Sequence, residues 1–387
     1  MGTLKGKCAI VGYGETRQHK HPDKVTRDLL AEAVVMAVED AGLEKKDVDG
    51  FITMRELNTR LPNMSQETFN DYLLFSDQLR MLQEMCVGGA TANCMAAHAA
   101  AAIESGMCRV VVCAGAGKFS KDIRGEIIMS SNFSWDFEAI YGPPVHTMNA
   151  IAANRHMFER GFTAEHLAKV VVYQRKWALM HPNSYTYGGR ELTVKEVLNS
   201  RMISTPLTLY MCSIPCDGGA AFVVTSADVA KTLKHPPVYI LGEGECHPYG
   251  HISSAPRITP TGAYLAAQRA YEVAGIIPKD VDIGYCYDAF ASHVPAFMED
   301  MGFGEGRIGE FIDEGHTDLG GDLPWNTHGG LLSGGQAAGT GHIRYLGECV
   351  IQLRGEAGQR QVKKHEIGIV HGFGGMMACN SVLILGR

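Results

Sequence analysis

The sequence predicts an α/β protein made of two similar halves. A chain of 387 residues exceeds what one small core supports, so two domains or an internal duplication are expected. One stretch of the first half recurs in the second, because LLAEAVVMAVEDAGLEKKDVDGFIT at 29–53 resembles YLAAQRAYEVAGIIPKDVDIGYCYD at 264–288. Each copy has the pattern of an amphipathic helix, a glycine stop, a short loop and a strand, an alternation typical of α/β folds.

The segments around this repeat also match. A β-rich start, KCAIVGYGETR at 7–17, precedes the first copy, and PVYILGEGECH at 237–247 precedes the second. Later in each half come a glycine pair, a helix rich in small residues and a strand-like run. These are Gly88-Gly89, 90–106 and 108–115 in the first half, and Gly329-Gly330, 335–355 and 366–375 in the second. We therefore expect one half over 1–235 and another over 236–387, with the small-residue helices packed closely at the centre.

A less hydrophobic stretch separates the strand-like parts of the first half. Residues 118–205 carry tyrosine and asparagine in runs such as WALMHPNSYTYGGREL. An insertion of this size usually forms a lid or a surface for a partner.

Composition narrows the class of partner and the compartment. With 45% hydrophobic and 20% charged residues the chain is typical of a globular protein, and its net charge of −7 argues against nucleic acid as the main partner. No apolar run reaches the roughly 18 residues of a membrane span, and MGTLKGKCAIVGYG lacks the long apolar stretch of a signal peptide. We therefore expect a cytoplasmic protein with reduced thiols. Cys212 and Cys216, in CSIPC, lack a second ligand pair at zinc spacing, so core thiols and no metal are expected.

One glycine-rich turn has the form of a reactive site without a reactive side chain. NTHGGLLSGGQAAGTG at 326–341 is a tight turn that leads into a helix, where an enzyme often holds an acid/base group. The residue at that point is Gln336, whose amide donates and accepts hydrogen bonds but exchanges no proton near neutral pH. The site is therefore expected to rely on electrostatics here, with proton transfer carried by other residues.

Four motifs in a fixed order resemble those of a known family. They are CDGGAAFVVTS at 216–226, YDAF at 287–290, NTHGG at 326–330 and VHGFGG at 370–375. On a duplicated scaffold this set resembles the thiolase superfamily, in its sterol-carrier-protein-type and lipid-transfer-like branch, over essentially the whole chain. The resemblance implies a five-layer αβαβα thiolase fold with a loop-domain insertion, usually dimeric, which acts on acyl-CoA thioesters. Coenzyme A is then a substrate or a thioester carrier.

The family's nucleophile is missing at its usual place. Relatives that catalyse Claisen chemistry carry a cysteine at the start of the first central helix, where the helix dipole favours thiolate. The equivalent position here is Gly89, which cannot be acylated. Cys86 lies three residues earlier and Cys94 five later, so neither matches without a shift of the loop. Cys86 is the expected thiolate source if the reaction is thiolytic.

The other family motifs carry altered groups. The box that reads N-E-A-F or H-D-C-F in relatives has Tyr287 and Asp288, and the histidine of the G-H-P box is replaced by Gln336. His371 matches the H-N-L-G box of the sterol-carrier type, so the resemblance implies it as the main acid/base group, although a buried histidine is more often structural. The expected catalytic set is Cys86, Tyr287, Asp288, His293, His328, Gln336 and His371.

Backbone donors complete the expected site. Cleaving a carbon–carbon bond beside a thioester builds enolate charge on the thioester oxygen, and each well-placed donor contributes roughly 3 to 4 kcal/mol. The backbone N–H groups of Gly89 and Gly374 are expected to form this oxyanion hole. The pairs Gly88-Gly89 and Gly329-Gly330 are also compatible with simple close packing at helix starts.

Three functions remain open from the sequence. The favoured one is thiolysis of a bulky aryl or branched β-ketoacyl-CoA in a degradation pathway, because Gln336 breaks the tyrosine pattern that aldolases of this branch often have. The second is a retro-aldolase on a β-hydroxyacyl-CoA, which Tyr287 favours, and the third is a non-catalytic acyl-CoA- or lipid-binding homologue. The resemblance implies a small zinc-ribbon/OB-fold partner of the DUF35 family, in a hetero-oligomer around a homodimer.

Overall fold

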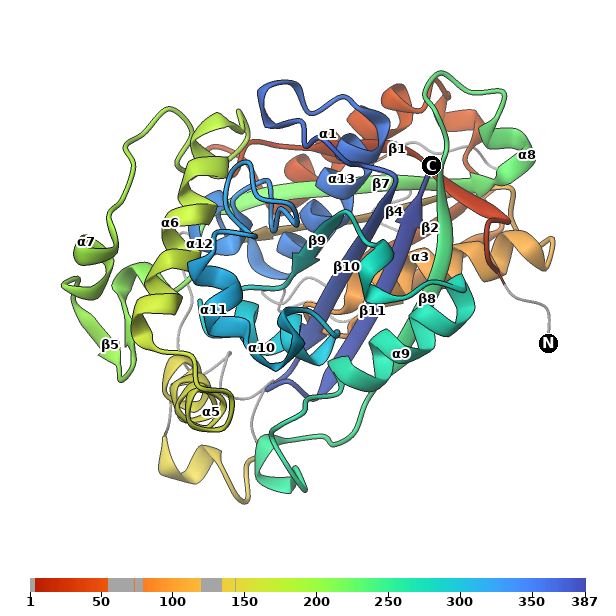
Figure 1. Cartoon of the computed structure of the whole chain (residues 1–387). Helices are drawn as coiled ribbons and strands as arrows, with labels where there is room; N and C mark the ends of the chain where they lie inside the picture. The colour runs from red at the N-terminus through yellow and green to blue at the C-terminus, as the bar shows by residue number, and fades with distance from the viewer. Residues whose placement is uncertain (1–3, 55–72, 74–78, 120–133, 143) are drawn as a thin grey trace.

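A computed structural model describes residues 4–54, 73, 79–119, 134–142 and 144–387. Within these ranges the strands form a nine-stranded sheet in the order β3-β2-β4-β7-β1-β8-β11-β10-β9 (Figure 1). The strands are β1 Cys8–Glu15, β2 Gly50–Met54, β3 Met81–Met85, β4 Val110–Lys118, β7 Asp217–Ser226, β8 Val238–Cys246, β9 Ile283–Cys286, β10 Ile367–Gly374 and β11 Cys379–Gly386.

The sheet order is a mirror image about the contact between β1 and β8. These two strands pair through Ala9–Tyr239 and Ile10–Val238, and β2-β4-β7-β1 on one side corresponds to β9-β10-β11-β8 on the other. The helices correspond in the same way: α1 Thr26–Asp40 with α9 Ala263–Ala274, and α3 Thr91–Glu104 with α13 Gly341–Arg354. The duplicated α/β class predicted from the sequence is confirmed.

Glycines bring the outer helices against the sheet in both halves. A Cβ on Gly12 would overlap the Ala37 carbonyl oxygen of α1, and a Cβ on Gly242 would overlap the Ala270 carbonyl oxygen of α9. Only glycine permits this approach, so the repeated Gly and Ala positions follow from one packing requirement met twice.

The repeated aspartates fasten neighbouring strands. Asp49 Oδ1 accepts hydrogen bonds from the backbone amides of 109–110 at 2.8 and 2.9 Å, at the entry to β4. Asp282 Oδ2 accepts from the amides of 366–367 at 2.9 and 3.1 Å, at the entry to β10. These carboxylates satisfy backbone donors, which accounts for their recurrence without any role in a site.

Two central helices lie between the strands of the two halves. α3 and α13 contact strands of both halves, whereas α1 covers the outer face of β1 and β7 and α9 covers β8 and β11 (Figure 1). The succession from α1 to α9 is therefore αβαβα. Ser381 Oγ of β11 donates to the Ala90 carbonyl at 3.0 Å, and Asn93 Nδ2 of α3 donates to the Val370 carbonyl at 2.8 Å. These bonds fix the start of α3 against the second half.

The insertion occupies the chain between β4 and β7. Its described part contains α5 Val145–Arg160, α6 Ala164–Met180, α7 Val194–Leu198, β5 Met202–Ser204 and β6 Leu207–Thr208, while 120–133 and 143 lie outside the described residues. α6 packs against α11 Ile308–Asp313 and α12 Gly330–Gly334, so the insertion rests on the second half. The other α-helices of the described ranges are α8 Ala227–Ala230 and α10 His293–Asp300. None of the helices in the described ranges has the length and apolar character required to cross a bilayer.

Candidate active site

The start of α3 meets the end of β10. The preceding turn is held by Thr91, whose Oγ1 donates to the Gly88 carbonyl at 2.6 Å and accepts from the Val87 amide at 2.9 Å. A Cβ on Gly88 would lie 2.6 Å from the Gly374 Cα. The backbone segments that carry Gly89 and Gly374, called the glycine hinges below, are therefore in main-chain contact. They are expected to supply the oxyanion donors.

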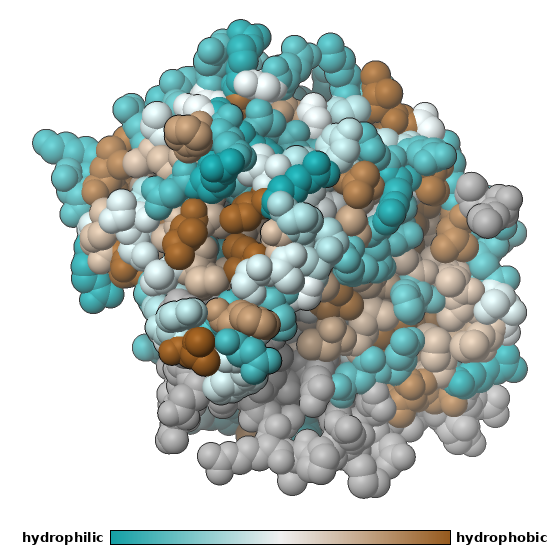
Figure 2. Space-filling model, turned by 90° about the horizontal axis from the view of Figure 1, so that it is seen from below, coloured by the Kyte–Doolittle hydropathy of each residue, from teal (hydrophilic) through white to brown (hydrophobic). Residues whose placement is uncertain are grey.

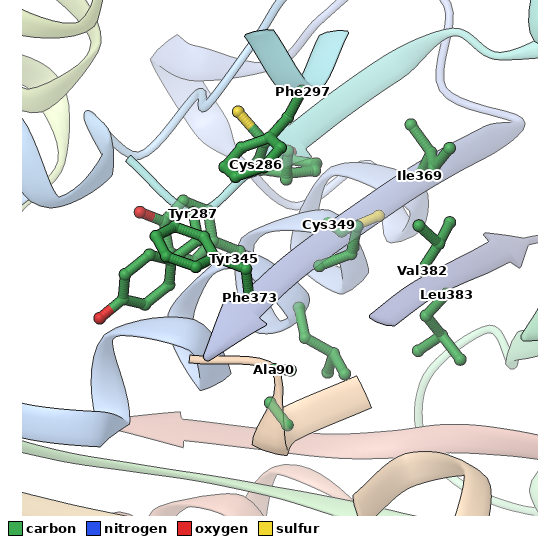
Figure 3. Close-up of a cluster of buried hydrophobic side chains, with 14 of the residues drawn as sticks. Ala90, Cys286, Tyr287, Phe297, Tyr345, Cys349, Ile369, Phe373, Val382 and Leu383 are labelled. Atoms are coloured by element: carbon green, nitrogen blue, oxygen red, sulfur yellow. The ribbon is translucent and has the colours of Figure 1, made fainter. Parts of the chain in front are cut away.

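Gly89 is surrounded so closely that no side chain fits. A Cβ at this position would lie 2.5 Å from the Phe373 carbonyl oxygen and 2.5 Å from Cε2 of Tyr287. The rings of Tyr287 and Phe373 meet edge to face at 5.1 Å between centroids, above Ala90 at the start of α3 (Figure 3). The ring of Tyr287 thus fills the space that a nucleophile at position 89 would need.

Gln336 connects Tyr287 to a residue that the sequence analysis did not identify. Its Nε2 donates to the Tyr287 hydroxyl at 2.9 Å, and its Oε1 accepts a hydrogen bond from the Ser213 hydroxyl. Burial raises the pKa of Tyr287 to about 12, against the opposing effect of the Gln336 hydrogen bond. Ser213 belongs to the CSIPC segment, whose only sequence signal was its cysteine pair.

Two of the predicted histidines lie beside this group and are neutral at pH 7. His371 is fully buried on β10 with Nε2 3.2 Å from Asn380 Oδ1, and burial lowers its pKa to about 4. His293 starts α10 with Nε2 2.9 Å from Asn149 Oδ1 of the insertion helix α5, and burial lowers its pKa to about 3. Since each asparagine oxygen can only accept, both rings carry their proton on Nε2 and leave Nδ1 as an acceptor.

His342 is a site candidate that the sequence analysis missed. It lies in the first turn of α13, fully buried, and neither ring nitrogen has a hydrogen-bond partner among the described residues. A Cβ on Gly372 would overlap its ring, and its centroid is 6.4 Å from that of Tyr287. Burial lowers its pKa to about 3. The available signal was its place at the start of the second central helix, the counterpart of the Gly89 region in the first.

Asp288 and His328 shape the turn next to the site. Asp288 Oδ1 accepts from the Leu331 amide at 2.8 Å and from the Tyr345 hydroxyl, which fixes the start of α12. Burial raises the pKa of Asp288 to about 6. His328 is fully buried with its ring 4.6 Å from that of Tyr345, and burial lowers its pKa well below the usual value. These two residues therefore contact the Tyr345 side of the turn, and their described contacts are with the fold.

Cys86 is the accessible thiol of this region. All eleven cysteines are described, and Cys86 is the one that is exposed, directly before the hinge. Cys94 is buried inside α3, where burial raises its pKa above the usual range and so favours the unreactive thiol. The structure brings Tyr287, Gln336, His293 and His371 close to the hinges, and exposed Cys86 lies just before the Gly88-Gly89 turn in the chain.

Comparisons with known proteins identify the family. Residues 244–387 match the family model described as Thiolase C-terminal domain-like. The chain is 31% identical to an acetyl-CoA acetyltransferase of Methanothermobacter thermautotrophicus, over 98% of this chain and 99% of the relative. It is 32% identical to a steroid side-chain-cleaving aldolase of Thermomonospora curvata, over 92% of each chain. A solved structure named Ltp2-ChsH2(DUF35) aldolase superposes with a TM-score of 0.88 at 31% identity, over 100% of this chain and 99% of that chain.

The chain therefore belongs to the thiolase family, in the branch that includes the sterol-carrier-protein-type thiolases. This membership establishes a thiolase-like enzyme fold, and members of the family act on CoA thioesters. The reaction and the partner are properties of the individual relatives and do not follow from membership alone.

Proposed function

We propose that this protein cleaves the Cα–Cβ bond of a β-hydroxyacyl-CoA in a retro-aldol reaction. The observation that carries the proposal is the filled space at Gly89, where the Tyr287 ring lies 2.5 Å from any added Cβ. A covalent acyl intermediate needs a nucleophilic side chain with room around it, and neither is available at that position. A reaction without an acyl-enzyme is consistent with this geometry.

The proposed reaction needs no external reactant. The hydroxyl O–H bond and the Cα–Cβ bond break, a ketone or aldehyde C=O bond forms, and the electron pair moves to the thioester enolate. The proton from the hydroxyl is returned to the α-carbon, which yields a shorter acyl-CoA. Tyr287 relays this proton: its oxygen accepts the proton of the substrate hydroxyl while its own proton passes to the α-carbon. The side-chain amide of Gln336 stabilises the charge that develops on the phenol during this transfer. Neither free CoA nor water is consumed.

The enolate is stabilised by the hinge. Main-chain N–H groups of Gly89 and Gly374 are proposed as oxyanion donors, because the hinges that carry them are in contact and surrounded by buried groups. His371 assists as a neutral ring, since a pKa of about 4 leaves it uncharged during turnover at pH 7. A neutral ring accepts or donates a hydrogen bond without bringing a cation into a dry site.

Relatives support cleavage of this kind without deciding it. Besides the Thermomonospora aldolase, a Mycobacterium tuberculosis relative named 17-hydroxy-3-oxo-4-pregnene-20-carboxyl-CoA lyase is 33% identical over 91% of this chain. Thiolysis remains the competing function, favoured by exposed Cys86 and by a relative named benzoylsuccinyl-CoA thiolase subunit BbsB, 32% identical over 62% of this chain.

The test compares CoA dependence and thiol dependence. The chain, co-expressed with a zinc-ribbon/OB-fold partner, is assayed on β-hydroxyacyl-CoA and β-ketoacyl-CoA panels with branched, aryl and steroid side chains, with and without free CoA. We expect CoA-independent release of a ketone or aldehyde, full activity of Cys86→Ala, and a loss of about 10² to 10⁴-fold in Tyr287→Phe. A strict requirement for free CoA, together with an acyl adduct on Cys86 in intact-mass spectra, would establish thiolysis instead. Silence across both panels would support a binding protein.

The partner is the second part of this proposal. The structural neighbour named above is an aldolase complex with a DUF35 protein. The insertion of this chain exposes apolar side chains between residue 134 and the end of α5. This face, seen from below in Figure 2, carries hydrophobic side chains among hydrophilic ones. The exposed apolar residues of this segment are Trp135, Phe137, Ile140, Tyr141, Ile151 and Phe158. We propose this segment as the docking surface of the zinc-ribbon/OB-fold protein, because exposed apolar patches mark interfaces.

Binding measurements test the docking surface. Tyr141 and Phe158 are 80% and 83% exposed, so Tyr141→Asp with Phe158→Asp should abolish co-purification with the partner while leaving the fold intact. Ile277→Asp, at an exposed apolar residue outside the insertion, is the matched control and should retain the partner. Retention of the partner by the double variant would remove this surface from the proposal.

A further inference from the structure

We infer that Ser213 is a positioning residue that sets, through Gln336, the direction of the Tyr287 hydroxyl proton. The inference rests on the proposed function, because the direction matters only if Tyr287 exchanges a proton with substrate. It also assigns a role to the Ser213 side chain within the CSIPC segment.

The loop that carries Ser213 is clamped between the two motifs that it connects. Its backbone amide donates to the Ala289 carbonyl of the YDAF segment at 2.9 Å. The Gln336 backbone N–H donates to the Ile214 carbonyl at 2.7 Å, and the Cys216 backbone N–H donates to the Gln336 backbone carbonyl at 3.0 Å. The Ser213 side chain is therefore held in a fixed place relative to both Tyr287 and Gln336.

Three polar groups in a row have two possible directions of hydrogen bonding. In the observed one, the Ser213 hydroxyl donates to Gln336 Oε1, and Gln336 Nε2 donates to the Tyr287 oxygen. The phenol then accepts, and its own proton points elsewhere. In the reverse direction Tyr287 donates to Oε1 and Nε2 donates to Ser213, so the phenol proton is engaged within the protein.

Ser213 supports the observed direction because its hydroxyl donates to the amide oxygen. With a serine hydroxyl on Oε1, the Gln336 oxygen needs no proton from Tyr287, and the phenol keeps its proton for a ligand. Without that hydroxyl, the partly buried Oε1 lacks a donor; the amide then turns over, so that the phenol donates to Oε1 and Nε2 faces the side that the serine hydroxyl left. Removing Ser213 should thus lock the Tyr287 proton onto Gln336.

Kinetics of three variants test the inference. Ser213→Ala should lower kcat roughly tenfold with KM unchanged, the rate equivalent of one net hydrogen bond. Ser213→Thr keeps the hydroxyl and should restore kcat. Gln336→Glu places an acceptor-only carboxylate between the two hydroxyls at high pH, so its activity should rise as the pH falls and the carboxyl takes up a proton. Ser184→Ala, at a buried serine that donates to the Ser333 carbonyl, is the matched control and should leave kcat unchanged.

A second readout does not depend on turnover. The C–O stretch of Tyr287, isolated by isotope-edited infrared difference against Tyr287→Phe, reports whether the phenol donates or only accepts. We expect a shift to the donor position in Ser213→Ala and no shift in Ser213→Thr or Ser184→Ala. An unchanged band in Ser213→Ala, or equal kcat in the alanine and threonine variants, overturns the inference. Failure of the proposed function would instead appear as absent turnover with the infrared shift preserved.

Discussion

Two buried polar regions of this protein differ in charge: one consists of paired charged side chains and the other of neutral histidine rings. The ionic cluster consists of Glu15, His181, Arg344, Glu348 and Arg360, all buried. Its members pair with one another: Arg344 Nε lies 2.7 Å from Glu15 Oε2, and Arg360 Nη2 lies 2.9 Å from Glu348 Oε2. The histidine group near Tyr287 has no such pairing, and its three rings leave nitrogens without partners among the described residues. These atoms are Nδ1 of His293, Nδ1 and Nε2 of His342, and Nδ1 of His371.

The difference appears in the protonation states. In the ionic cluster burial alone would raise the pKa of Glu15, but Arg344 and His181 outweigh it and lower that pKa. In the histidine group burial acts almost alone and lowers each pKa, so the rings stay neutral. Paired charges make a fixed element of structure, whereas neutral polar groups without protein partners are candidates for contact with a ligand. The comparison predicts which substitutions damage the fold and which change only the site.

The largest expected effect is the removal of a cation from the ionic cluster. Arg344→Met leaves the Glu15 carboxylate buried without its main partner and should lower the free energy of unfolding by about 3 to 5 kcal/mol. Denaturant unfolding at pH 7 measures this loss. Adding Glu15→Gln should recover much of it, because no unpaired charge then remains. A loss below about 1 kcal/mol in the single variant would mean that the cluster does not hold charge as described.

The intermediate effect is a change in the pH dependence of stability. The folded-state pKa of His342, about 3, lies below the ordinary value near 6.5, so the unfolded chain binds the proton first as the pH falls. Stability is therefore lost as the pH falls from 6.5 toward 3, by up to about 1 kcal/mol per pH unit for this residue. His342→Leu should remove that part of the slope, as measured by unfolding at a series of pH values.

His316 supplies a control of opposite sign. Hydrogen bonding to Asp322 raises the pKa of His316 in the folded protein. Its contribution to the free energy of unfolding is therefore complete below the pKa of the unfolded chain and is lost as the pH rises through the folded-state pKa. His316→Gln should therefore leave the slope between pH 6.5 and pH 3 nearly unchanged. An equal change of slope in both variants would show that acid stability does not distinguish the buried ring from the surface pair.

The fold could be predicted from the sequence because its cause is local and repeated. Gly12 and Gly242 recur with the alanines that pack on them, and the repeat at 29–53 and 264–288 encodes the same helix and strand twice. The hinge at Gly89 could also be located, because its motif precedes a small-residue helix. Such signals lie within one short stretch of chain, where periodicity and glycine placement are visible.

The remaining parts of the site depend on contacts between distant segments. Ser213 reaches Gln336 across 123 positions, and the CSIPC string carries no mark of that contact. His342 gave no signal beyond its place at a helix start, and the low pKa values of the histidines follow from burial that only the folded chain creates. Asp288 and His328 lie in motifs that the sequence shows, but their contacts with Tyr345 link separate segments and could not be predicted.

The smallest expected effect on stability belongs to the residue with the largest proposed effect on catalysis. Tyr287→Phe keeps the ring that packs at Gly89 and Phe373 and removes only the hydroxyl that accepts from Gln336 at 2.9 Å. The Gln336 side chain keeps its hydrogen bond from the Ser213 hydroxyl. The free energy of unfolding should therefore fall by about 1 kcal/mol or less. Urea unfolding of this variant beside Arg344→Met measures the contrast directly. A decrease of about 3 kcal/mol or more in the free energy of unfolding would show that the Tyr287 hydroxyl is a structural group like those of the ionic cluster. A hydroxyl whose main partner is a ligand contributes little to folding stability before the ligand binds.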